Sequence, residues 1–313
     1  MTTVRNRTSA LDYDAADEVI IPGETLPEYG ETKRIRGNGY EFEAFFSTRN
    51  ARLRVVRYVA SDLAKMVHCL KIHALQQQAG KIFLKSPMVD AAPLKLLGFQ
   101  QEAVIKGYFN GNDAAVLSFF PDEQRTVPMP DEKERRQIVV TSSSAPPAES
   151  KPLPAGFSCR IAGARDAGVL AAVFAACFES YPFPVFDPNY ILKSMQNDVV
   201  YMMILRGEQP AAIASAETVP ELGNAEMTDF ATLPDFRGNG LGAILLRALE
   251  REMVHRGIPN LYTLARAGAI SINRIFGRAG YQYTGTLVRN CHISGDFEDM
   301  NCWCKQLSYC NFG

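Results

Sequence analysis

The chain has 313 residues, of which 47% are hydrophobic and 21% are charged, and its formal net charge at neutral pH is −1. This length suits two domains, each with a packed core of its own. There is no basic excess that would favour nucleic acid, and no apolar run approaches the ~18 residues of a membrane-spanning helix. We therefore expect neither nucleic-acid nor membrane partners.

The first residues and the cysteines both favour a cytoplasmic protein. Residues 1–19 are polar and acidic and lack the apolar segment of a signal peptide. The seven cysteines, an odd number, are typical of free thiols in a reducing compartment. The spacing of Cys302 and Cys304 does not fit a zinc knuckle and suits alternate positions of a final strand. We expect no bound metal.

Composition also divides the chain. Residues 141–156 are rich in serine, proline and alanine, so they cannot bury a face and are expected to form an extended linker. Before them we expect an N-terminal arm over residues 1–35 and a first lobe over residues 36–140. After them we expect a larger domain over residues 157–313.

The first lobe has a strand–helix–strand–helix–hairpin pattern. Its expected elements are a strand at 52–60, a helix at 61–79, a strand at 81–85, a helix ending near 97–99, and hairpin strands at 102–108 and 114–120. This order repeats the second half of the following domain, which predicts a degenerate copy of it. An unrelated α/β domain is the alternative. The lobe contains no turn with the pattern R-x-x-G-x-G, which the second domain has at residues 237–242, so we predict that the lobe does not bind the cofactor that this turn indicates.

The second domain alternates helices and strands. We expect helices at 164–179, 190–196, 241–256 and 271–278, with strands at 199–205, 211–217, 225–232, 261–265, 281–289 and 301–307. Prolines in residues 180–188 predict a loop between the first two helices.

A turn of small residues precedes the third of these helices. Arg237, Gly240 and Gly242 form the pattern R-x-x-G-x-G between a strand and a helix. The first backbone N–H groups of a helix are free, and the helix dipole favours an anion there. Because glycine lacks a Cβ, a phosphate can approach the backbone closely. The turn therefore predicts a phosphate-bearing cofactor.

The same turn also fits a dinucleotide-binding pattern, G-x-G-x-x-A, over residues 238–243. A Rossmann domain would begin with this motif, whereas three predicted strands precede it here. Ala265 and Arg266 stand where an acidic residue would end the next strand. These two departures disfavour a dinucleotide.

The turn resembles the pyrophosphate loop of the GNAT acetyltransferases, and the predicted order ααβββαβαββ matches their α/β (α+β) fold. Residues 273–281, N-R-I-F-G-R-A-G-Y, resemble a second GNAT pattern, N-x-x-[FY]-x-x-x-G-[FY]. The resemblance implies acetyl-CoA as cosubstrate. The cofactor-binding residues that it implies are Phe230, Thr232, Arg237, Gly238, Asn239, Gly240, Leu241, Gly242, Asn273 and Phe276.

The resemblance also implies individual roles. A backbone N–H of Phe230 or of a direct neighbour would stabilise the oxyanion, while Thr232 and Asn273 would bind the pantetheine arm. Phe276 stands where many GNAT enzymes have a tyrosine that protonates the leaving thiolate. Because the reference pKa of a thiol is ~8.5, the thiolate can leave unaided. The alternative proton donors are Tyr262, Tyr281 and Tyr283.

Three acidic residues lie near the expected acyl centre. Attack on a thioester needs a neutral amine, yet an alkylammonium has a pKa of ~10.4 and must first lose a proton. Glu217, Glu226 and Asp229 favour a cationic substrate, although each also suits a solvated strand end. Glu226 and Asp229 face opposite sides of a regular strand, so a bulge is needed to bring them together. Arg266 suits a substrate carboxylate, a CoA phosphate or an acidic neighbour.

A closer resemblance is to the β-lysine N-acetyltransferases. It rests on residues 181–188, 215–217, 224–234, 262–267, 280–287 and 300–301, and more loosely on residues 81–85 and 98–103. The family implies transfer of acetyl to the N6 amine of β-lysine, which gives a compatible solute. A lysine 2,3-aminomutase is the implied pathway partner.

On this resemblance, we expect Glu226 or Asp229 to accept the proton, directly or through water. Glu217 would hold the other ammonium and Arg266 the carboxylate. The loop that carries Tyr181, Phe183 and Phe186 would close the pocket. Alternatives are another acceptor (a polyamine, an aminoglycoside or a protein lysine) and a non-catalytic module that binds acetyl-CoA. The first lobe is also a candidate surface for a homodimer.

Overall fold

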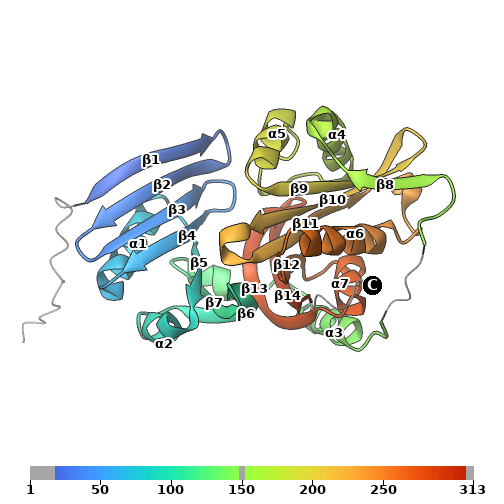
Figure 1. Ribbon diagram of the computed structural model, residues 1–313. Coiled ribbons are helices and arrows are strands. Elements are labelled where there is room, and N and C mark those ends of the chain that lie inside the picture. The colour runs from blue at the N-terminus through green and yellow to red at the C-terminus, as the bar shows by residue number, and fades with distance from the viewer. Residues whose placement is uncertain (1–17, 148–151, 308–313) are drawn as a thin grey trace, which may run out of the picture.

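The computed structural model describes residues 18–147 and 152–307, and within them two seven-stranded sheets lie side by side (Figure 1). The first 17 residues and Cys310 lie outside the described residues. Six cysteines of the described part are free thiols, as expected. No helix in this part is long and apolar enough to cross a membrane.

The N-terminal sheet has the strand order β1-β2-β3-β4-β5-β7-β6, with helices α1 and α2 packed on it. Among the strands that the structure describes in this sheet, β4 and β5 are the only parallel neighbours. Its elements are β1 (Val19–Leu26), β2 (Gly30–Gly37), β3 (Tyr40–Ser47), β4 (Arg52–Ala60), α1 (Leu63–Gln76), β5 (Lys81–Pro87), α2 (Met88–Leu96), β6 (Gln100–Phe109) and β7 (Asn112–Phe119).

The expectation of an N-terminal arm over residues 1–35 is wrong from Val19 onward, because β1 and most of β2 lie within this range. The side chains of β1 are exposed on both faces of the strand, so its sequence carries no apolar alternation. Main-chain pairing with β2 holds this edge strand in place.

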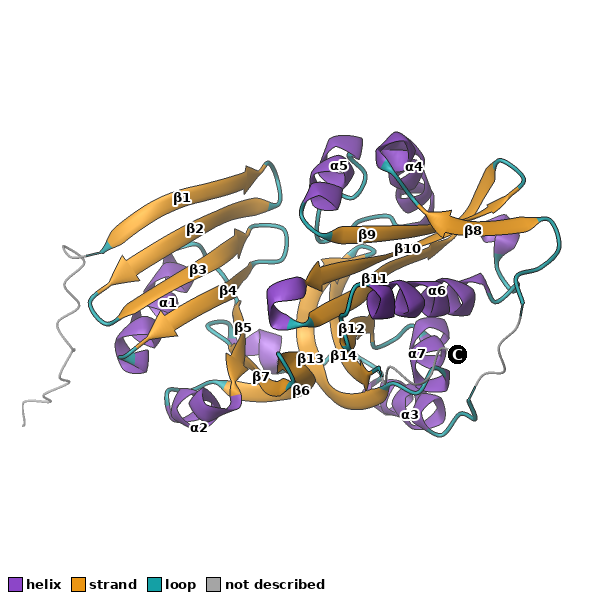
Figure 2. Cartoon of the chain, viewed as in Figure 1, coloured by secondary structure: helices purple, strands orange, loops and turns teal. Residues whose placement is uncertain are grey.

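The second sheet has the order β13-β14-β12-β11-β10-β9-β8, with only β11 and β12 parallel. Its helix α6 packs on one face and α4 and α5 on the other (Figure 2). Its elements are β8 (Phe157–Ile161), α4 (Ala167–Cys177), α5 (Pro188–Gln196), β9 (Val199–Arg206), β10 (Gln209–Val219), β11 (Asn224–Thr232), α6 (Leu241–His255), β12 (Asn260–Arg266), α7 (Ile270–Arg278), β13 (Gln282–Ile293) and β14 (Asp296–Gln306).

The two sheets share one topology. Strands β1 to β7 occur in the same spatial order as β8 to β14, and α1 and α2 take the places of α6 and α7. This confirms that the first lobe is a GNAT-like copy. Two insertions distinguish the second domain: α4 and α5 follow β8, where residues 27–29 form a short turn in the first lobe. The loop 233–240 precedes α6, where only Ser61 and Asp62 precede α1.

The sheets contact each other in a reciprocal way. The first residue of β4, Arg52, donates a hydrogen bond of 2.6 Å from Nη1 to the carbonyl of Asn290 on β13. The first residue of β11, Asn224, donates one of 2.7 Å from Nδ2 to the carbonyl of Tyr108 on β6. Each sheet therefore binds the hairpin of the other through equivalent positions, which indicates an approximate two-fold relation.

Helix α3 (Glu132–Ser143) crosses the boundary expected between the first lobe, residues 36–140, and the linker, residues 141–156. It packs on α7 so closely that a Cβ at Gly277 would lie 2.2 Å from the carbonyl oxygen of Ser142. The expectation of an extended linker is therefore wrong for residues 141–143, because packing against the second domain stabilises the helix.

Candidate active site

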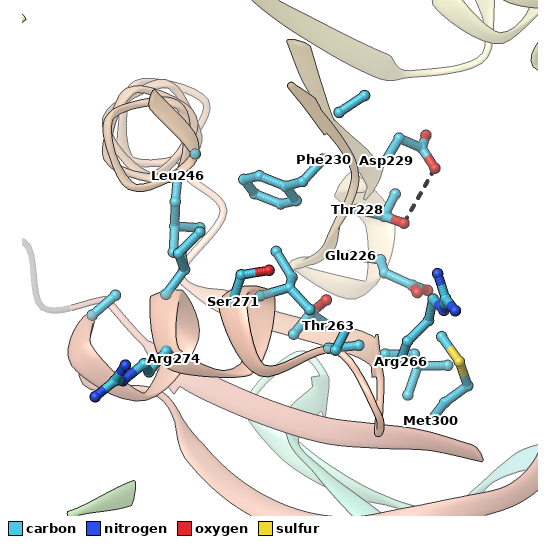
Figure 3. Close-up of a pocket in the computed structure, with 18 of the residues that line it drawn as sticks. Glu226, Thr228, Asp229, Phe230, Leu246, Thr263, Arg266, Ser271, Arg274 and Met300 are labelled. Carbon is cyan, nitrogen blue, oxygen red and sulfur yellow. Dashed lines mark hydrogen bonds between the residues drawn. The ribbon is translucent and has the colours of Figure 1, made fainter. Parts of the chain in front are cut away.

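One large cavity, of about 1440 Å³, opens where the parallel strands of the second sheet separate. The pairing of β11 with β12 ends at Glu226 and Tyr262, and beyond these residues the strands diverge. Thr228 and Phe230 of β11 and Thr263 of β12 line the gap (Figure 3). Residues of both lobes contribute to the cavity walls.

A β-bulge shapes the cavity side of β11. Ser215 of β10 pairs with Thr228 and Ile213 pairs with Ala231, so β11 carries an extra residue at Asp229-Phe230. Asp229 has a φ of 56°, in the left-handed region. In Figure 3 the Asp229 side chain lies on the same side of the strand as Glu226, while Phe230 points away from it toward α6. The expected bulge is therefore confirmed.

The Asp229 carboxylate is buried among hydroxyl groups. Tyr181 Oη and Ser215 Oγ each donate to it at 2.5 Å, one to Oδ1 and the other to Oδ2, and Thr228 Oγ1 donates to Oδ1 at 3.3 Å. Burial raises the pKa of Asp229, although these hydroxyl hydrogen bonds oppose the shift. Both oxygens are occupied, so Asp229 is suited to fixing the bulge and the Tyr181 loop.

Glu217 and Glu226 face each other across β10 and β11, where they form a cross-strand pair. Burial in the cavity wall, together with the charges of Glu226 and Asp229, raises the pKa of Glu217 to about 8. A cation placed between these acids would stabilise their ionised forms. The expected acidic cluster is thus present, and it lines the cavity.

The N-terminal lobe supplies basic residues to the same cavity, namely Arg52 and Arg54 of β4 and Lys85 of β5. Lys85 Nζ donates to Tyr262 Oη at 2.6 Å, and burial together with the charge of Glu226 raises the pKa of Tyr262. Sequence reasoning missed these residues. The sequence feature that could have identified the arginines is their alternation with apolar residues at the start of β4. Such alternation indicates that the charged face of the strand is covered by another part of the protein.

The glycine turn lies at the start of α6, and most of it lines the cavity. Gly238 and Gly240 have φ values of 82° and 71°, and no atom lies within 4 Å of a Cβ added at either position. The backbone conformation thus favours glycine, and the space in front of the turn is open to a phosphate. Arg237, Leu241 and Thr232 also line this end of the cavity.

Two residues of the turn have packing roles. A Cβ at Gly242 would lie 2.9 Å from Ile275 Cδ1, so glycine there lets α6 approach α7. Asn239 does not line the cavity; its Nδ2 donates to the carbonyl of Phe236 at 3.0 Å and braces the turn.

Comparisons with known proteins agree with this geometry. The acetyltransferase (GNAT) family model matches residues 170–277. N-acetyltransferase YodP of Bacillus subtilis is 36% identical over 88% of this chain and 99% of its own length. Two β-lysine N(6)-acetyltransferases are also similar: that of Methanosarcina mazei is 35% identical over 76% of this chain and 95% of its own, and that of Methanococcus maripaludis is 31% identical over 83% and 94%. The chain belongs to the β-lysine N6-acetyltransferase family.

As a GNAT enzyme, the protein is an acetyl-CoA-dependent N-acetyltransferase that acts on an amine. The fold accounts for acetyl-CoA as cosubstrate: the open turn before α6 suits the pyrophosphate, and the gap between β11 and β12 connects it to the acids.

Asn273 does not reach the cavity of this GNAT enzyme, contrary to the role expected for it. The side chain is fully buried. Its Nδ2 donates at 2.8 Å to the carbonyls of Arg266 and Ala269, and its Oδ1 accepts at 2.9 Å from Asn301 and Trp303. These bonds tie α7 to β12 and β14, so the Asn273 side chain positions the helix and has no polar group left for pantetheine.

Two aromatic residues expected at the site also lie outside the cavity lining. Phe276 is buried, with its ring edge-on to Phe230 and Tyr281, and therefore belongs to the core of the GNAT domain. Phe186 packs partly buried in the cluster around α4. From the same loop, Phe183 lines the cavity.

Arg266 lines the cavity but already has an acidic partner. Its Nη2 lies 2.7 Å from Glu298 Oε1, and its Nη1 donates to Ser294 Oγ at 3.1 Å. Of the three partners considered for Arg266, the structure favours the acidic neighbour. The expectation that Arg266 holds the substrate carboxylate is therefore wrong, because Glu298 and Ser294 already engage its two terminal nitrogens.

Outside the cavity, Glu18, Cys69 and His73 bring possible metal-ligating atoms within 4.8 Å of one another. Hydrogen bonds account for this arrangement, because Cys69 Sγ lies 2.7 Å and His73 Nε2 lies 3.0 Å from oxygens of Glu18. The absence of a metal therefore stays a prediction.

Proposed function

We propose that this enzyme transfers the acetyl group of acetyl-CoA to the N6 amine of β-lysine. The observation that carries the proposal is the pairing of Glu217 with Glu226 in the cavity that begins at the glycine turn. β-Lysine has two ammonium groups and one carboxylate, so paired acids complement its excess positive charge. Two of the similar proteins are β-lysine N(6)-acetyltransferases, which supports this acceptor.

Glu226 is the proposed proton acceptor. Glu226 and Asp229 both line the cavity, but both oxygens of Asp229 are occupied by hydroxyl groups. Glu226 takes a proton from the N6 ammonium, directly or through a water molecule, and leaves a neutral amine. Glu217 holds the second ammonium group of the substrate.

The neutral N6 then attacks the carbonyl carbon of the thioester. A C–N bond forms, and a main-chain N–H beside Phe230 stabilises the negative oxygen of the tetrahedral intermediate. The C–S bond breaks and CoA leaves as a thiolate, which is reasonable for a thiol with a reference pKa of ~8.5. The thiolate then takes the second proton that the nitrogen must lose to become an amide. The bulge at Asp229-Phe230 fixes this part of the backbone.

The product has the properties of a compatible solute. Acetylation removes one of the two positive charges of β-lysine and leaves a zwitterion without net charge. A lysine 2,3-aminomutase in the cytoplasm is the proposed source of β-lysine.

The test is release of free thiol from acetyl-CoA by the purified protein with β-lysine, and in parallel with L-lysine, spermidine and an aminoglycoside. We expect rapid release with β-lysine, and mass spectrometry and NMR of the product should show a single acetyl group on N6. Faster release with another amine would replace the acceptor while leaving the acetyl-transfer chemistry. No release with any of the four would contradict the proposal.

A further inference from the structure

We propose that Arg54 of β4, a residue of the N-terminal lobe, binds the substrate carboxylate and so determines specificity for an amino acid over a simple amine. The inference rests on the proposed function, because β-lysine has a carboxylate that must be bound. Arg266, which the sequence suggested for this role, is paired with Glu298.

Arg54 is a partly buried cation that lines the cavity. Within residues 18–147 and 152–307, its side chain makes no hydrogen bond or ion pair, and its Nε is buried without a partner. Its guanidinium carbon lies 5.4 Å from the centre of the Phe183 ring. On the same strand, by contrast, Arg57 donates two hydrogen bonds to Glu43. A partly buried guanidinium whose N–H donors have no hydrogen-bond partner favours an anionic ligand that can accept from them.

The duplicated fold explains why Arg54 faces the acids. Arg54 pairs with Phe83 at the third position of the parallel β4–β5 pairing, and Glu226 pairs with Tyr262 at the third position of β11–β12. The approximate two-fold relation brings these equivalent positions to one cavity. Arg54 also acts electrostatically on Glu217, whose pKa it lowers against the stronger effect of burial. One cavity thus has acids from one lobe and an arginine from the other.

The other cations near the acids are engaged. Lys85 donates to Tyr262 Oη and lies 4.8 Å and 4.6 Å from the ring centres of Tyr108 and Tyr262. Arg52 donates to the carbonyl of Asn290. Arg54 is left with a planar group whose paired N–H donors match the two oxygens of a carboxylate.

The experiment compares two substrates and three variants of the full chain. The substrates are β-lysine and its carboxamide, which keeps both amines and loses the negative charge. The variants are Arg54→Met, Arg54→Lys and the control Arg57→Gln on the exposed side of the same strand. For each protein, kcat/KM for the amine and KM for acetyl-CoA are measured.

We expect Arg54→Met to lower kcat/KM for β-lysine about 10- to 100-fold, mainly through KM, and to leave kcat/KM for the carboxamide nearly unchanged. Arg54→Lys should recover part of the loss, and Arg57→Gln should behave as wild type. If Arg54→Met lowers kcat/KM equally for both substrates, the role of Arg54 is structural. This result would overturn the inference and leave the proposed function intact.

If wild type does not acetylate β-lysine, the proposed function fails first. The same comparison is then made with the amine of the panel that reacts fastest. If that amine is an amino acid, the Arg54 variants are tested with it and with its amide. If the enzyme prefers amines without a carboxylate, the inference is overturned.

Discussion

Two acidic residues of β11, three positions apart, have different surroundings because of one extra residue in the strand. Both residues line the cavity, but Glu226 lies before the bulge, whereas Asp229 lies in the bulge and both of its oxygens accept hydrogen bonds from hydroxyl groups. A proton acceptor must exchange protons with the substrate, so a carboxylate whose two oxygens are already hydrogen-bonded is a poor choice. The bulge thus separates a chemical role from a positioning role.

Replacement of Glu226 with Gln should lower kcat/KM about 100-fold or more, because a positioned general base typically contributes 10²–10⁴-fold. The melting temperature should change little, since Gln has nearly the same shape. Thiol release measures the rate, and Glu208→Gln in the exposed β9–β10 turn is the control. A Glu226→Gln enzyme with wild-type kcat/KM would refute the assignment.

The raised pKa of Glu217 predicts a specific dependence of stability on pH. Between its ordinary value of 4.5 and about 8, the folded protein retains a proton that the unfolded chain releases. The free energy of unfolding therefore falls as pH rises through this window, and Glu217→Gln should remove the loss. Melting temperatures from about pH 5 to pH 9 should show the variant gaining on wild type until about pH 8. A difference that does not vary with pH would contradict the shift.

At the scale of elements, the effect of a glycine in the turn before α6 on backbone strain can be distinguished from its effect on ligand binding. Gly240 and Gly207 both have positive φ, 71° and 59°, and an added Cβ would meet no atom within 4 Å at either position. Only Gly240 lines the cavity.

Gly240→Ala and Gly207→Ala should therefore lower stability by a similar amount, about 1 kcal/mol. Only Gly240→Ala should also raise the KM for acetyl-CoA, because its methyl group occupies the space offered to a phosphate. Thermal unfolding and initial rates at varied acetyl-CoA provide the two readouts. An equal KM in both variants would show that the turn does not bind the cosubstrate.

At the scale of the whole molecule, a buried ion pair joins the two lobes. Lys81 Nζ lies 2.8 Å from Glu102 Oε2, and both residues hydrogen-bond the backbone of Val288 on β13. Removing one partner of a buried pair leaves the other charge uncompensated.

We expect Lys81→Met to lower the free energy of unfolding by about 3–5 kcal/mol, and the double variant Lys81→Met/Glu102→Gln to recover much of the loss. Lys106→Met, which removes an exposed pair with Asp113, should cost less than about 1 kcal/mol. Urea unfolding measures all three. If the double variant is no more stable than Lys81→Met, the uncompensated charge is not the cause.

Short sequence patterns predicted those features of the site that depend on residues close together in the chain. The glycine turn, the helix after it and the acids of β10 and β11 follow from short stretches of sequence, and the bulge follows from the family resemblance. Arg54 and Lys85 were not predicted as site residues, because their place depends on how one sheet packs against the other. Asn273 was placed wrongly for a related reason: its partners Asn301 and Trp303 come from a distant strand.

The shared topology of the two sheets has an evolutionary consequence. If an ancestral single-sheet protein paired with itself about a two-fold axis, each position that lines the cavity would have occurred there twice with the same side chain. Gene duplication and fusion remove that constraint, because each half can then mutate independently. The present chain has arginine at one such position and glutamate at its counterpart, so one composite pocket can distinguish the two ends of a substrate, which an assembly of identical subunits cannot do with these positions.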